Sequence, residues 1–174
     1  MIIRKLYNSR NQTRTKGVGW FNRCFFIQCD IVFNMRYVLD TDVVVSAMRS
    51  PTGASAALLL AALDGLFVLV ANVPLVVEYE ATCSLAEHQL AAGLNEKEVG
   101  QFLDALAALA DPVETYFLWR PRLRDPADEM VLEAAVNGRA DAIVTFNLRD
   151  YGTIPNDFGI EVLKPFEALK RLKQ

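Results

Sequence analysis

From Met35 onward, short apolar segments alternate with longer segments that have the pattern of helices. Strands that are apolar throughout are expected to be buried on both faces, as in a parallel sheet. Their alternation with helices predicts an α/β protein with a three-layer α/β/α fold and right-handed crossovers. The central parallel sheet is expected to have four to five strands. The predicted strands are residues 37–39, 67–70, 113–118, 142–145 and 160–163.

Capping residues delimit the predicted helices. Asn95 is a good N-cap with Glu98 three residues later, and Gly138 is a typical stop signal. Asp125 precedes a proline and an acidic first turn, as at the start of many helices. The predicted helices are Ala54–Leu63, residues 74 to about 90, 95–110 and 125–138, and a last helix that Pro165 opens.

The 174-residue chain is expected to contain one domain, at residues 35–174, preceded by a different kind of segment. Residues 1–34 lack periodicity and hold six Lys/Arg against one acid, whereas residues 35–174 hold twelve against twenty. We predict that residues 1–34 form a basic N-terminal tail or extension. Disorder and an added strand over residues 24–33 are the two alternatives for it.

Several function classes are disfavoured by composition. No apolar run reaches the length of a membrane span and no secretory leader is evident, so we expect a cytoplasmic protein. The cysteines Cys24, Cys29 and Cys83 include no C-x-x-C pair, and we expect reduced thiols without a role. His88 is the only histidine and is expected on a helix surface. Zinc sites and serine- or cysteine-based catalysis are therefore disfavoured.

Acidic and amide side chains follow each of the first four predicted strands. Because ligands of open parallel sheets bind at the carboxyl ends of the strands, these groups are expected to share one edge. Hard oxygen ligands suit Mg²⁺ or Mn²⁺, which can activate water for hydrolysis of a phosphodiester. No glycine-rich phosphate loop is present. The residues are Asp40, Asp42, Glu78, Asp125, Asp128, Asn147 and Asp150.

Most of these acids also have a purely structural interpretation. Asp125 is expected to be an N-cap, and Asp42 either caps a helix or joins the site. Asp128 either favours the helix dipole or binds metal. Glu80 is expected to face solvent, because it cannot share a helix face with Glu78.

Four segments resemble the motifs of the PIN-domain family, in order and at sensible spacing. They are residues 37–46 (YVLDTDVVVS), 74–79 (PLVVEY), 125–135 (DPADEMVLEAA) and 140–150 (ADAIVTFNLRD). The similarity spans residues 36–170 and is greatest to VapC-like toxins of bacterial toxin–antitoxin systems. Two positions depart from the family pattern, which often has Asn at Asp42 and Asp at Asn147.

The resemblance implies a Mg²⁺- or Mn²⁺-dependent ribonuclease. Asp40, Glu78, Asp128 and Asp150 would bind metal, and Asn147 would complete the catalytic set. The implied partners are an RNA substrate, a cognate antitoxin and a second copy of the chain in a homodimer.

An acidic domain must hold RNA through local cations. Arg120, Arg122 and Arg124 follow the third predicted strand and Arg149 follows the fourth, so we predict that they bind phosphates beside the cut site. The alternative is that they are solvated loop arginines.

Three other function classes fit this sequence less well. A PIN fold that binds partners without catalysis is the main alternative. A receiver-like signalling domain is more remote, because residues 113–120 lack the acceptor Asp that would end its third strand. A dehalogenase-like phosphatase would need Thr or Ser where Val44 stands.

Overall fold

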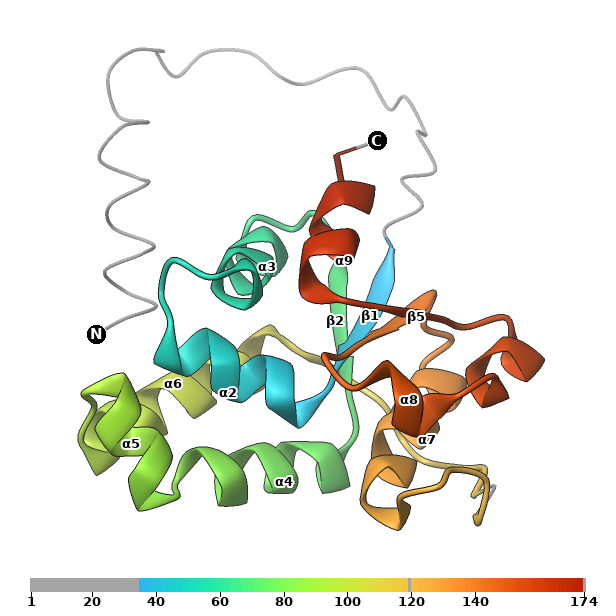
Figure 1. The fold of residues 1–174 in the computed structure, drawn as a ribbon, viewed down its shortest axis with the longest axis horizontal. Helices are drawn as coiled ribbons and strands as arrows, with labels where there is room; N and C mark the ends of the chain where they lie inside the picture. The colour runs from blue at the N-terminus through green and yellow to red at the C-terminus, as the bar shows by residue number, and fades with distance from the viewer. Residues whose placement is uncertain (1–34, 119, 174) are drawn as a thin grey trace, which may run out of the picture.

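The computed structural model describes residues 35–118 and 120–173, and the predicted tail lies outside them. At its centre is a sheet of five parallel strands flanked by helices (Figure 1). This confirms the predicted α/β fold and its parallel sheet. The strands are β1 (Arg36–Leu39), β2 (Val68–Ala71), β3 (Asp111–Pro112), β4 (Ala142–Val144) and β5 (Glu161–Leu163).

The strand order is β3-β2-β1-β4-β5, with β1 in the middle. Tyr37 of β1 pairs with Leu69 of β2 on one side and with Ala142 of β4 on the other. The sheet therefore grows in opposite directions from β1, and such a switch point leaves a crevice at the carboxyl ends of β1 and β4. Receiver domains have the order 2-1-3-4-5, so the observed order excludes that class.

Apolar side chains from both helical layers enclose the strands. Leu39, Val70 and Ile143 are fully buried in the sheet, and α7 packs across β1, β2 and β4. A Cβ at Gly138 would lie 2.4 Å from Val70 Cγ1, so glycine lets the end of α7 approach β2. The helices are α2 (Thr41–Arg49), α3 (Ala54–Leu63), α4 (Val73–Cys83), α5 (Ala86–Ala92), α6 (Glu96–Leu109), α7 (Glu129–Asn137), α8 (Leu148–Tyr151) and α9 (Pro165–Arg171), with 3-10 turns η1 (Pro126–Asp128) and η2 (Ile154–Phe158).

Capping chemistry placed several helices as predicted. Helix α3 has the expected bounds, and α6 begins with a capping box between Asn95 and Glu98. Helix α2 is the main element that the sequence pattern did not predict. Its three consecutive valines have low helix propensity, but Val43 and Val44 are fully buried. Tertiary packing therefore outweighs propensity there.

The predicted helix over residues 74–90 is wrong in its length. The chain leaves helical geometry at Leu85, with φ −63° and ψ 134°, and α5 then packs against α2. A single continuous helix would carry residues 86–92 away from α2. Because the helix breaks at Leu85, both α4 and α5 contact α2.

The predicted strand over residues 113–118 is also wrong. Only Asp111 and Pro112 pair with β2, through Val70 and Ala71, and β2 ends there. Beyond that point the backbone is held by a side chain instead, because Asn137 Oδ1 accepts the N–H groups of Tyr116 and Phe117, each at 3.0 Å.

Within the described residues, no single helix is long and apolar enough to span a bilayer. Helices α2 and α3 reach that composition only as a pair bent by 99°.

Candidate active site at the sheet switch point

Asp40 joins the end of β1 to the start of α2. Its Oδ1 accepts the N–H of Thr41 at 2.6 Å, which makes it the N-cap of α2, and its Oδ2 accepts the hydroxyl of Tyr151 at 2.9 Å. Only 7% of the residue is exposed. Burial raises the pKa of Asp40, hydrogen bonds from Thr145, Tyr151 and Thr41 lower it, and the charge of Asp150 raises it. Asp40 is thus fixed in orientation but poorly solvated.

Asp42 lies in the first turn of α2 and bridges to the end of β4. Its Oδ2 accepts the N–H of Phe146 at 2.9 Å and the hydroxyl of Thr145 at 3.3 Å. Its Oδ1 is buried without a hydrogen-bond partner. Burial and then the charge of Asp40 raise the pKa of Asp42 to about 6. The cap of α2 is Asp40 and not Asp42, whose carboxylate instead lies close to Asp40 at the end of β4.

Asp128 ends the 3-10 turn η1 and precedes α7. Asp125 caps that turn by accepting the N–H of Ala127 at 2.9 Å, as predicted. Burial, followed by the charges of Asp40, Asp125 and Asp150, raises the pKa of Asp128 to about 7. Asp128 therefore belongs electrostatically to the group at the end of β1.

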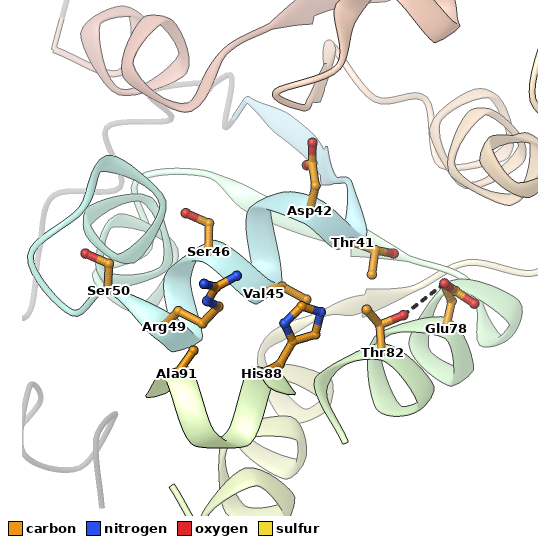
Figure 2. Close-up of a pocket in the computed structure, with 10 residues that line it drawn as sticks. All are labelled: Thr41, Asp42, Val45, Ser46, Arg49, Ser50, Glu78, Thr82, His88 and Ala91. Atoms are coloured by element: carbon orange, nitrogen blue, oxygen red, sulfur yellow. Dashed lines mark hydrogen bonds between the residues drawn. The ribbon is translucent and has the colours of Figure 1, made fainter. Parts of the chain in front are cut away.

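Glu78 lies on α4, the helix that follows β2. Its Oε1 accepts the hydroxyl of Thr82 at 3.0 Å, and it lines a cavity with Thr41 and Asp42 (Figure 2). The neighbouring Tyr79 is buried and donates its hydroxyl to the carbonyl of Leu39, which ties α4 to the end of β1. Glu80 is exposed, as predicted.

Asn147 and Asp150 follow β4 and interact with each other. Asn147 Nδ2 donates to Asp150 Oδ2, and the Asn147 N–H donates to Thr145 Oγ1 at 2.9 Å. A carboxylate at position 147 would repel Asp150, so the amide found here orients Asp150 instead.

Comparisons with known proteins show the family and the fold. Residues 36–149 match the family model of the PIN domain. The chain belongs to the PIN-domain family. No curated protein sequence matches it. Among solved structures, it is similar to VapBC2 from Rickettsia felis bound to a DNA fragment from their promoter, at 15% identity and a TM-score of 0.53. The similarity covers 75% of this chain and 98% of that one, and it shows a shared fold.

The PIN domain has oxygen donors suited to a hard cation, but its carboxylates do not close around a single point. Among residues 35–118 and 120–173, no three His, Cys, Asp or Glu side chains form a ready-made metal-binding group. The donor chemistry still fits, because three partly buried acids have raised pKa values and Asp42 Oδ1 lacks a partner. A bound cation would offset this repulsion.

The four arginines differ in their surroundings. Arg120 forms a two-pronged ion pair with Glu133, at 2.7 and 2.9 Å, so its charge is already matched. The Nη2 atom of Arg122 lies 3.6 Å from Asp157 Oδ2, and its Cζ atom lies 5.8 Å from the centre of the Phe158 ring. Arg124 and Arg149 are exposed, and no ion pair to either occurs within the described part of the chain.

Sequence reasoning did not identify the polar face of α7. Glu129 Oε1 accepts the N–H groups of Arg122 and Leu123 at 2.5 and 2.8 Å, and Glu133 holds Arg120. Asn137 holds the backbone around Phe117. Glu129, Glu133 and Asn137 are spaced i, i+4, i+8 and therefore share one face of α7. This spacing is visible in the sequence and would have predicted a polar face. These residues position the segment that enters η1 and hence Asp128.

Proposed function

We propose that this PIN domain is a metal-dependent endoribonuclease that hydrolyses RNA phosphodiester bonds, as the toxin of a toxin–antitoxin pair. The observation that carries the proposal is the group Asp40, Asp42 and Asp128, whose burial and mutual repulsion raise their pKa values. Confining such acids at a sheet switch point is costly unless a cation offsets their charge. Family membership supports the same conclusion.

In this proposal Asp40, Glu78, Asp128 and Asp150 hold Mg²⁺ or Mn²⁺. The bound ion would activate a water molecule and stabilise the leaving oxygen of the phosphodiester. Tyr151 keeps its proton, because burial raises its pKa, and its hydroxyl holds Asp40 in place. Asn147 orients Asp150 in the same way. Water attacks directly in this route, without a covalent protein intermediate.

We further propose that exposed arginines guide the RNA and that a partner protein controls access. Arg124 and Arg149 are exposed and are proposed to bind phosphates together with Arg122, whereas Arg120 serves structure through Glu133. The similarity to VapBC2 supports a cognate antitoxin, which could insert Arg or Lys among Asp40, Glu78 and Asp128. The proposed toxin acts in the cytoplasm as a homodimer.

The test is cleavage of single-stranded RNA by the purified chain. We expect cleavage with Mg²⁺ or Mn²⁺ and none with EDTA. An antitoxin fragment should inhibit it, and added Mn²⁺ should partly reverse the inhibition. Full activity in EDTA would contradict the metal mechanism, and inhibition that ignores Mn²⁺ would contradict insertion at the metal site.

A catalytically silent PIN domain that binds partners is the second candidate. It is favoured by Asn147, and by the finding that no three potential ligands among the described residues form a metal-binding group. Absence of cleavage at every Mn²⁺ concentration, with antitoxin binding intact, would support this alternative.

A further inference from the structure

A cavity of about 670 Å³ lies beside the acids, between α2, α4 and α5 (Figure 2). Its volume is in the range of small-molecule and cofactor sites. Asp42 and Glu78 line one end of it, and the far end is lined by α2 and α5. Asp42, Val45, Ser46 and Arg49 recur at helical spacing, so one face of α2 forms a wall that runs away from the acids.

The far end of the cavity has the opposite charge. Arg49 ends α2, and it makes no ion pair with any described acidic residue. Figure 2 shows that Arg49 lines the cavity together with His88, from α5. His88 is not the surface residue that the sequence suggested, since only 18% of its side chain is exposed and its Nδ1 is buried without a partner. Ser46 and Ser50 of the same helix segment also line the cavity, and the hydroxyl of Thr82 donates to Glu78 at the acidic end.

The helix rise places Arg49 about 10 Å from Asp42 along α2. A cation held by the acids at one end and the Arg49 guanidinium at the other can each bind a phosphate of one strand. Hydroxyl and imidazole groups between them can hydrogen-bond to a ribose 2′-hydroxyl or a base edge. An amphipathic helix would need an apolar groove, whereas only Val45 and Ala91 of the lining residues are apolar.

We propose that this cavity binds a nucleotide of single-stranded RNA next to the scissile phosphate. Arg49 binds its phosphate, and Ser46, Thr82 and His88 recognise its ribose or base. This inference rests on the proposed function, since it assigns the cavity to the same substrate.

The experiment measures binding separately from cleavage. Fluorescence anisotropy in EDTA follows labelled random-sequence RNA and DNA hexamers on the full chain. We expect RNA to bind more tightly than DNA. Arg49→Met should weaken RNA binding roughly tenfold and reduce the slope of log affinity against log salt by about 0.7, as for one lost phosphate contact. Arg49→Lys should keep most of the RNA affinity and of the salt slope. Ser46→Ala should reduce the difference in affinity between RNA and DNA.

Lys170→Met is the matched control, because Lys170 is an exposed cation on α9 outside the cavity. Its affinity and salt slope should equal those of the wild type, and thermal melting checks that every variant is folded. In Mn²⁺, Arg49→Met should raise KM for RNA cleavage with kcat little changed.

Wild-type RNA affinity in Arg49→Met would overturn the proposal. So would loss of antitoxin affinity alone, which would assign the cavity to the protein partner. If the wild type never cleaves RNA yet binds it through Arg49, the nucleotide site stands and the nuclease proposal fails.

Discussion

Acidic side chains of two kinds lie on and just before α7. Glu129 and Glu133 have partners that match them, whereas Asp128 lies among other carboxylates. Glu133 is 2% exposed and is matched by both prongs of Arg120, and Glu129 accepts two backbone N–H groups through Oε1, although its Oε2 is buried without a partner. Asp128, one residue before Glu129, instead faces Asp40 and other carboxylates, and its pKa rises to about 7.

This difference separates acids that hold the fold from acids that are available for chemistry. A buried carboxylate such as Glu133, whose charge is matched by a guanidinium, holds that partner in place, and removal of the partner destabilises the fold. A buried carboxylate next to others raises the free energy of the folded state unless a cation binds. Perturbed pKa values of the second kind are typical of functional sites.

The largest expected effect is on cleavage. Asp40→Asn, Glu78→Gln and Asp128→Asn should each reduce RNA cleavage about a thousandfold, because metal stabilisation of the transition state is worth several kcal/mol. The melting temperature should not fall, since Asn keeps the helix cap at position 40 and the loss of a charge relieves the repulsion. Single-turnover cleavage in Mn²⁺ measures the effect. Loss of activity in Asp125→Asn but not in Asp128→Asn would show that the wrong acid had been chosen.

The next effect is on stability. Arg120→Met should lower the free energy of unfolding by about 2 kcal/mol, because it leaves Glu133 buried without a countercharge. The cost is below that of a fully buried pair, since half of the Arg120 side chain is exposed. Urea titration measures it, and the double variant with Glu133→Leu should regain much of the loss.

The matched control for that experiment is the ion pair of Arg171 with Glu161, whose carboxylate is half exposed, whereas that of Glu133 is buried. Arg171→Met should cost well under 1 kcal/mol. Equal losses in the two single variants would remove the distinction between partnered buried acids and surface pairs.

A smaller effect concerns pH. The folded-state pKa values of Asp42 and Asp128, about 6 and about 7, lie above the ordinary carboxyl value. The folded state therefore holds more protons than the unfolded state between about pH 4 and 7, and stability in EDTA should fall as pH rises through that window. After allowance for solvent screening we expect about 1 kcal/mol, or roughly 3 °C in Tm. Asp128→Asn should make Tm depend less on pH. The prediction would be contradicted if the Tm of the wild type rose with pH and this variant abolished the rise.

The smallest effects are expected at acids outside the repelling group. Glu80→Gln should leave cleavage within about twofold of the wild type, because Glu80 is exposed on α4. Asp125→Asn should behave similarly and cost only a few tenths of a kcal/mol, since Asn is also a good N-cap. Both are measured by cleavage and urea titration, and a large loss of activity at Glu80 would extend the site beyond its proposed limits.

The sequence was sufficient to predict those elements that local interactions determine. Asn95 with Glu98 and Asp125 act through neighbours close in the chain, and the α6 cap and the η1 cap formed at the expected residues. The continuous apolar segments also marked four of the five strands near the expected residues, although each strand pairs with partners far away in the chain. The edge strand β3 and helix α2 lacked such local signals. Their residues have weak or opposing local preferences, so packing decided them.

The acidic residues divide in the same way. Their order along the chain, and their positions after the strands, followed from the sequence and identified Asp40, Asp128 and Asp150 as candidates. Which acids are matched and which repel one another depended on the tertiary structure, because Arg120 reaches Glu133 only when the segment before η1 folds back onto α7. The charge of a side chain is set by the sequence, but its electrostatic energy is set by the groups that folding places around it.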